Sequence, residues 1–337
     1  MKAYRIFMAL LALTAILPAP AFTSREVVID NNADGVKLAG TLTMPDSGKP
    51  RAAILMITGS GSQDRDETVF GHKPFRTIAE YMSDRGYAVL RTDDRGTGSS
   101  TGSSDGITTT SNIRDAGASL HWLVAEYPDV PVGLLGHSEG GQIAYRMASD
   151  SVCRFIITMG APAWRGDSLI MAQSRAIAVA STGSWPGEQL QRTLVTAAAS
   201  DAPAFSARVM MLSALSEALG EQAKLPQVQE MLGRQIDGML SPWYREFLRY
   251  DPVTAIKSVT VPWLALNGSK DLQVPPANLE TISALNPRAE IRLMEGLNHL
   301  FQPAATGLPQ EYAAINSDVS SETLAAMARW LDEKFGK

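Results

Sequence analysis

Cysteine and histidine are scarce in this sequence, which contains one cysteine, Cys153, and four histidines among 337 residues. A single cysteine excludes an intramolecular disulfide, so the fold depends on its core and not on covalent links. No H-E-x-x-H pattern and no cysteine pair occurs that could hold zinc. The sequence therefore disfavours a metalloenzyme. The histidines are His72, His121, His137 and His299.

Nucleotide-binding loops are also missing. A G-x-G-x-x-G pattern that starts at Gly59 has Asp64 in its last position, and one that starts at Gly96 has Thr101 there. No P-loop pattern occurs either. The chain has no basic run and carries a formal net charge of −5 at pH 7. Nucleic acids and anionic membranes are therefore disfavoured as partners.

The longest apolar run is confined to the N-terminus. Lys2 and Arg5 precede the apolar residues 6–17, and small residues and prolines follow up to Ala21. This run is much shorter than the roughly 20 residues that span a bilayer. The order predicts a signal peptide, residues 1–21, that is cleaved near Ala21. We expect a periplasmic or secreted protein without stable membrane association.

The next part of the chain predicts an open α/β sheet. Two strands at 26–30 and 36–44 are joined by a turn sequence, NNADG, that favours an antiparallel hairpin. Apolar strands then alternate with helices, and this alternation predicts a parallel sheet covered on both faces. The predicted strands are 52–57, 88–91, 132–135 and 155–159, and the predicted helices are 75–85 and 112–127.

A helical insertion is predicted in the second half. Between residues 161 and 250 the strand pattern disappears, and helical stretches are broken at 183–186, 201–203 and 225–226. Strands then return at 261–266 and 290–294, with helices near 277–285 and at 321–335. We therefore predict an α/β core formed by residues 22–160 and 251–337, and a helical cap formed by residues 161–250.

The sequence GHSEGG at 136–141 places glycines on both sides of Ser138. It follows a predicted strand and precedes a helix. Such a tight turn strains the serine backbone and exposes its hydroxyl, and only glycine avoids collision at the flanking positions. The pattern predicts a nucleophile elbow with Ser138 as the nucleophile.

A serine nucleophile needs a base and an orienting acid. Asp271 directly follows the predicted strand 261–266, and His299 directly follows the strand 290–294. Ser138, Asp271 and His299 therefore occur in the chain order typical of an α/β-hydrolase triad. We predict His299 as the general base and Asp271 as its orienting acid. His137 is expected to be structural.

An acyl-transfer site also needs two donors for the oxyanion. The backbone NH of Glu139 is one candidate, and the NH of Ser60, in the loop after strand 52–57, is the second, with Gly61 as the alternative. The sequence does not assign a role to the side chain of Glu139, which either braces the site or faces solvent. The charged residues Arg95 and Asp64-Arg65-Asp66 are expected to brace this loop as a salt-bridge scaffold, with recognition of substrate charge as the alternative.

Several stretches together resemble bacterial α/β-hydrolase carboxylesterases whose hydrolase domain is related to serine aminopeptidases. They are GSGSQDRD at 59–66, DRGTG at 94–98, GHSEGG at 136–141, SPW at 241–243 with YDP at 250–252, and the segments around Asp271 and His299. The resemblance implies an α/β-hydrolase fold with an eight-stranded, mostly parallel sheet and a helical cap, no cofactor, and hydrolysis of short-chain carboxylic esters. Ser62 departs from the family pattern, which has proline there.

The sequence leaves rival functions open. An aminopeptidase or amidase uses the same triad but must anchor a free amine, and the acidic residues of the predicted cap are scattered. A thioesterase, an acyltransferase and a non-catalytic binding protein are further rivals. For an esterase we expect the cap to form an apolar roof that limits acyl length. The expected roof residues are Met171, Met210, Met211, Leu212 and Trp243.

Overall fold

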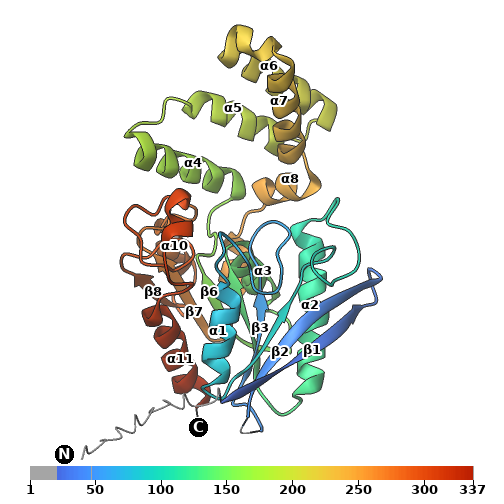
Figure 1. Ribbon diagram of the computed structural model, residues 1–337, viewed down its shortest axis with the longest axis vertical. Helices are drawn as coiled ribbons and strands as arrows, with labels where there is room; N and C mark the ends of the chain where they lie inside the picture. The colour runs from blue at the N-terminus through green and yellow to red at the C-terminus, as the bar shows by residue number, and fades with distance from the viewer. Residues whose placement is uncertain (1–20, 47, 337) are drawn as a thin grey trace, which may run out of the picture.

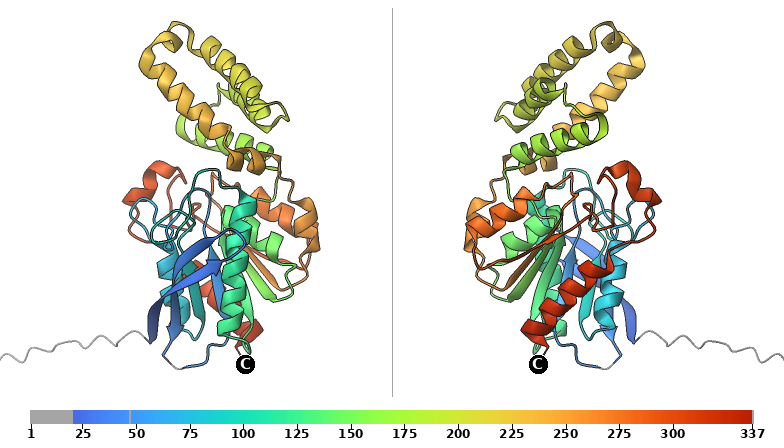
Figure 2. Two further views of the ribbon diagram at one scale, coloured as in Figure 1. Left: turned by 90° about the vertical axis from the view of Figure 1, so that its right-hand side faces the viewer. Right: turned by 90° about the vertical axis from the view of Figure 1, so that its left-hand side faces the viewer.

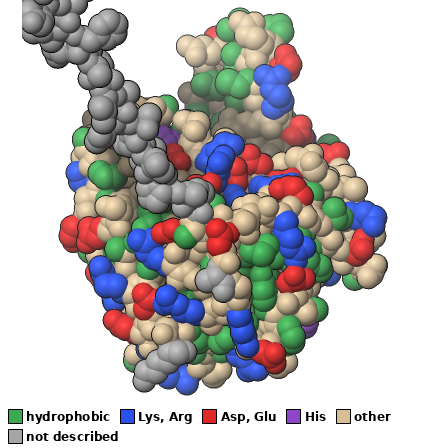
Figure 3. Space-filling view, turned by 60° about the horizontal axis from the view of Figure 1, so that its bottom comes forward, with side chains coloured by type: hydrophobic (Ala, Val, Ile, Leu, Met, Phe, Trp, Pro, Cys, Tyr) green, Lys and Arg blue, Asp and Glu red, His purple; other side chains and the backbone are tan. Residues whose placement is uncertain are grey.

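The computed structural model describes residues 21–46 and 48–336. The expected signal peptide, residues 1–21, therefore lies outside the described residues except for Ala21. Among the described helices, none is both long and apolar enough to cross a membrane. Basic and acidic side chains are interspersed on the face at the end of the sheet away from the helical segment (Figure 3).

Eight strands form one sheet in the order β1-β2-β4-β3-β5-β6-β7-β8. β1 pairs antiparallel with β2, and β2 pairs antiparallel with β4, whereas all other neighbours are parallel. The predicted antiparallel start and mostly parallel sheet are confirmed. The strands are β1 (Phe22–Asn31), β2 (Val36–Pro45), β3 (Ala53–Ile57), β4 (Ala88–Thr92), β5 (Val132–His137), β6 (Cys153–Met159), β7 (Trp263–Gly268) and β8 (Glu290–Met294).

Helices cover both faces of the sheet (Figures 1 and 2). Side chains of a strand alternate between faces, so neighbouring residues of β3 enter different cores. Leu55 packs on the face of α2 and α3, whereas Ile54 packs on the face of α1 and α11. The helices of the core are α1 (Pro74–Ser83), α2 (Thr109–Glu126), α3 (Glu139–Met147), α9 (Val253–Ser258), α10 (Ala277–Leu285) and α11 (Ser321–Phe335), with the 3-10 helix η2 (Pro309–Ala314) before α11.

A helical segment, residues 166–249, lies between β6 and α9. It has a core of its own, which includes Leu194, Met211 and Ile236. In Figures 1 and 2, α4 and α8 lie next to the sheet and α6 and α7 extend away from it. The segment consists of α4 (Gly166–Thr182), α5 (Glu188–Ala199), α6 (Ala204–Leu219), the 3-10 helix η1 (Gly220–Lys224), α7 (Pro226–Met239) and α8 (Pro242–Arg249).

The helical segment leaves and re-enters the core at one place. The amide of Gly166, where α4 begins, donates to the carbonyl of Tyr250, just after α8 ends, at 3.3 Å. A Cβ on Gly166 would lie 1.9 Å from the carbonyl oxygen of Phe247, so only glycine allows this approach. The two crossings therefore form a narrow neck that holds α4 and α8 beside the C-terminal ends of the parallel strands.

Candidate active site

Ser138 lies in a strained turn between β5 and α3. Its φ is 53° and its ψ is −121°, a conformation that costs free energy for a residue with a Cβ. A Cβ on Gly136 would lie 2.1 Å from the carbonyl oxygen of Gly140, and a Cβ on Gly140 would lie 2.0 Å from that of Ile57. The flanking glycines are therefore required by the close approach of three backbone segments.

Asp271 and His299 are brought together by the loops that follow β7 and β8. His299 Nδ1 lies 2.7 Å from Asp271 Oδ2, and both side chains are buried. The other carboxylate oxygen accepts the amides of Gln273 and Val274 at 2.9 and 2.8 Å, which fixes the carboxylate plane. Because Nδ1–H donates to Asp271, the Nε2 lone pair of His299 is left for a proton acceptor role.

A cavity of about 350 Å³ joins Ser138 and His299. It lies between the C-terminal ends of the strands and helices α4 and α8. Glu67 is the one carboxylate among the lining residues that the structure describes. Within the described residues, no group of three His, Cys, Asp or Glu side chains could hold a metal ion. Apolar or aromatic side chains that line the cavity include Phe70, Leu169, Ile170, Trp243, Phe247, Val274, Leu300 and Tyr312.

The expected roof of the cavity is only partly correct. Trp243 lines the cavity, but Met171, Met210, Met211 and Leu212 do not. Met211 is fully buried inside the helical segment, and Met210 is half exposed on the outer helix α6. The reason is that α6 packs on α5 and α7, away from the sheet, so the helical segment lines the cavity only through α4 and α8. Met171 lies on α4 but packs against the core of the helical segment.

The loop after β3 carries the candidate oxyanion donor. The amide of Gly59 donates to Glu67 Oε1 at 2.7 Å and is therefore occupied. Ser60 is exposed and lines the cavity together with Ser138. Gly61 adopts a positive φ of 95°, which glycine tolerates. Of these two candidate residues, Ser60 lines the cavity and Gly61 does not.

The carboxylate of Asp94 holds this loop by hydrogen bonds. Its carboxylate accepts the Thr58 hydroxyl at 2.8 Å and the Gln63 amide at 2.9 Å. Burial raises the pKa of Asp94 to about 7, opposed by these two hydrogen bonds and assisted by the carboxylates of Glu67 and Glu139. The loop is therefore held at both ends although serine replaces the expected proline at position 62.

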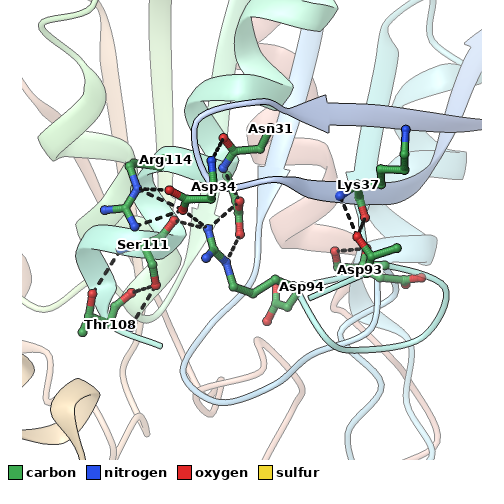
Figure 4. A network of polar contacts seen from close by, with 12 residues as sticks. Asn31, Asp34, Lys37, Asp93, Asp94, Thr108, Ser111 and Arg114 are labelled. Carbon is green, nitrogen blue, oxygen red and sulfur yellow. Dashed lines mark hydrogen bonds and ion pairs between the residues drawn. The ribbon is translucent and has the colours of Figure 1, made fainter. Parts of the chain in front are cut away.

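The charged residues expected to form one scaffold, Asp64-Arg65-Asp66 and Arg95, belong to two separate networks of ion pairs. Arg65 and Asp66 pair with Asp93 and Arg91, respectively, and thereby connect the loop to β4. The expectation for Arg95 is wrong, because its guanidinium pairs at 2.6 Å with both Asp34 and Asp115. Figure 4 shows this second network, in which Asp34 also faces Arg114. Arg95 thus braces the β1–β2 turn against α2.

The side chain of Glu139 is a brace and not a solvated group. It is 1% exposed, and its carboxylate accepts the Thr109 hydroxyl at 2.6 Å and the Trp243 indole N–H at 2.9 Å. Burial raises the pKa of Glu139, and the hydrogen bonds from Thr109, Trp243 and Ser60 oppose that shift. Glu139, the residue after Ser138, therefore ties this turn to α8. Sequence patterns gave no signal for this contact, because Trp243 is 104 residues away.

The remaining histidines differ in their surroundings. His137 is buried, with Nδ1 2.9 Å from Glu67 Oε1 and Nε2 2.9 Å from the carbonyl oxygen of His299. His121 is exposed on α2 and contacts Asp150. His72 contacts Asp318 and does not line the cavity. Of the three, only His137 therefore lies in the site.

Comparison with known proteins identifies the type of fold. The sequence profile of the family described as X-Pro dipeptidyl-peptidase (S15 family) matches residues 34–300, a range that contains Ser138, Asp271 and His299. The chain is 24% identical over 316 residues to esterase EstD of Thermotoga maritima, covering 92% of this chain and 68% of that protein.

Two solved structures are similar over nearly the whole chain. The Pyrococcus furiosus esterase Pf2001 has a TM-score of 0.57 and 18% identity, covering 94% of this chain and 92% of its own. Est1E of Butyrivibrio proteoclasticus, solved with ferulic acid, has a TM-score of 0.55 and 16% identity, covering 92% and 100%. The predicted α/β-hydrolase fold and the resemblance to esterases of that fold are confirmed.

Proposed function

The chain belongs to the X-Pro dipeptidyl-peptidase (S15) family, and we propose that it is a serine hydrolase that cleaves short-chain carboxylic esters. One observation carries the proposal: the buried pair of Asp271 and His299 shares a cavity with the strained Ser138. A buried acid, a base and a serine at the C-terminal edge of a parallel sheet are the parts of an acyl-transfer site.

In the proposed mechanism, Ser138 Oγ attacks the ester carbonyl carbon while His299 Nε2 takes the serine proton. Asp271 stabilises the resulting imidazolium. The negative charge on the carbonyl oxygen is held by the amides of Ser60 and Glu139. His299 then gives the proton to the leaving alcohol, and an acyl-enzyme remains on Ser138. Water, deprotonated by His299, then attacks the acyl carbon. The bond from the acyl carbon to Ser138 Oγ breaks, His299 returns the proton to Oγ, and the acid is released.

The polar groups of the cavity favour esters over peptides with a free N-terminus. An aminopeptidase must bind a substrate ammonium group, which requires an available carboxylate. Glu67 is the one carboxylate among the described lining residues. Its Oε1 is bonded to the Gly59 amide and to His137, and its Oε2 is buried. The name of the relative, esterase EstD, agrees with this argument. A peptidase is the second candidate, since the family itself bears a peptidase name.

We further propose that different parts of the chain have different roles. Residues 22–160 and 251–337 act as the catalytic core, and residues 161–250 act as a cap over Ser138. The narrow neck at Gly166 and the lining contributed by α4 and α8 support this division. Residues 1–21 act as a signal peptide for a periplasmic or secreted enzyme, a proposal based on the sequence alone.

A fluorophosphonate probe tests the nucleophile directly. We expect covalent labelling at Ser138, located by peptide mass mapping, and loss of ester turnover by about 1,000-fold or more in Ser138→Ala. Ser62→Ala is the matched control, because it removes an exposed hydroxyl from the neighbouring loop. Labelling at another serine, or turnover that survives in Ser138→Ala, would overturn the proposed mechanism.

A further inference from the structure

Both ring nitrogens of His137 face hydrogen-bond acceptors. Nδ1 lies 2.9 Å from the carboxylate oxygen Oε1 of Glu67, and Nε2 lies 2.9 Å from the carbonyl oxygen of His299. A neutral imidazole has one N–H and one lone pair, so it can donate to only one of these oxygens. Its second nitrogen would then direct a lone pair at an oxygen lone pair in a buried site, which is unfavourable.

A proton on Glu67 instead of on His137 would weaken a neighbouring hydrogen bond. Glu67 Oε1 also accepts the Gly59 amide at 2.7 Å, and a hydroxyl oxygen would accept this amide less strongly than a carboxylate oxygen does. The second oxygen, Oε2, is buried and has no hydrogen-bond partner among the described residues. A proton on Oε2 would therefore have no acceptor. The three hydrogen bonds of Glu67 Oε1 and His137 are therefore strongest when Glu67 is a carboxylate and both nitrogens of His137 carry protons.

We propose that His137 is held as an imidazolium whose two N–H groups join the oxyanion loop to the loop of the catalytic histidine. Through Glu67 it holds the Gly59 amide, next to the proposed donor Ser60, and through its other nitrogen it holds the backbone of His299. This inference rests on the proposed function, because it gives His137 a positioning role in the same site. His137 performs no step of the reaction.

The electrostatic surroundings agree with a charged ring. Burial opposes the charge, but the adjacent Glu67 carboxylate and the two hydrogen bonds outweigh burial and raise the pKa of His137, with a smaller contribution from Asp271. The His137 and His299 ring centroids are 4.7 Å apart. The titratable groups around His137 are therefore Glu67 from the loop after β3, Asp271 from the loop after β7, and His299 from the loop after β8.

Nitrogen-15 NMR of histidine-labelled protein tests the charge state. At pH 7.5 an ordinary histidine is mostly neutral. We expect a ring with two slowly exchanging N–H protons and imidazolium nitrogen shifts, and its signals should be lost in His137→Gln and kept in His72→Gln. His72→Gln separates the signals of His72, whose nitrogens also face a carboxylate and a carbonyl. A neutral His137 ring at this pH would overturn the proposal.

Kinetics test the positioning role. His137→Gln cannot donate to both acceptors, so we expect kcat for a p-nitrophenyl ester to fall by about 10- to 100-fold, with KM within about 3-fold. His121→Gln, an exposed histidine on α2, is the control and should keep wild-type rates. Wild-type kcat in His137→Gln would refute a positioning role.

Glu67→Gln provides the second variant if His137→Gln fails to fold. It keeps an acceptor for the Gly59 amide but removes the negative charge, so the imidazolium signature of His137 should be lost at pH 7.5. Retention of that signature would contradict the proposed ion pair. The NMR signature is measured without turnover and so does not depend on activity. If the fluorophosphonate probe failed to label Ser138 in the wild-type protein, the proposed function would be refuted, but the charge state of His137 could still be tested.

Discussion

At the scale of single residues, Asp94 connects pH to stability. Burial raises the pKa of this carboxyl to about 7, whereas its ordinary value is 3.8. Between about pH 4 and pH 7 the folded state therefore binds a proton that the unfolded state lacks, and the stability contributed by Asp94 is lost as pH rises. We expect Asp94→Asn to gain free energy of unfolding relative to the wild type across this window, measured by urea denaturation. Asp105→Asn, which removes an exposed carboxylate, is the control. A constant difference between Asp94→Asn and the wild type would contradict the assignment.

At the scale of secondary-structure elements, α8 holds the helical segment on the core. Its Trp243 both lines the cavity and donates to the buried Glu139, so this hydrogen bond joins the cavity wall to the turn that carries Ser138. We expect Trp243→Phe to lower the free energy of unfolding by about 1–3 kcal/mol, because a buried carboxylate loses its donor, and to raise KM more than it lowers kcat. The double variant with Glu139→Gln should lose less than the sum of the single variants. Trp164→Phe, which removes an indole bond to Thr281, is the matched control. Additive losses would show that the two residues act independently.

At the scale of the whole molecule, the cavity exists only where the helical segment meets the end of the sheet. Its volume of about 350 Å³ and its apolar lining bound the acyl group that fits. Each buried methylene should improve transition-state binding by up to ~0.8 kcal/mol until the cavity is full. We therefore expect kcat/KM for p-nitrophenyl esters to rise from acetate to butyrate or hexanoate and then to fall. Aminoacyl amides and thioesters belong in the same panel. A steady rise through long-chain esters, or preference for the amides or thioesters, would reassign the substrate class.

The sequence by itself determined the features that depend on local rules. The hairpin turn, the apolar strands and the helix breaks predicted the sheet and its helices, because these patterns act over a few residues. The glycines beside Ser138, and the positions of Asp271 and His299 after two strands, predicted the triad for the same reason. Short elements such as α9 and η2 were not predicted, since they carry too few residues for a periodic pattern.

Only the tertiary structure decided which distant residues meet. The contacts of Glu139 with Trp243 and of His137 with Glu67 join residues 104 and 70 positions apart. Arg95 pairs with Asp34 of the β1–β2 turn and Asp115 of α2, and not with the loop after β3, because the fold brings these two carboxylates to it from another side. The methionines of α6 are as apolar as residues that line a cavity. Hydrophobicity predicts that a side chain is buried, but it does not predict which residues the side chain packs against. That choice is made by how whole helices pack, which no local pattern encodes.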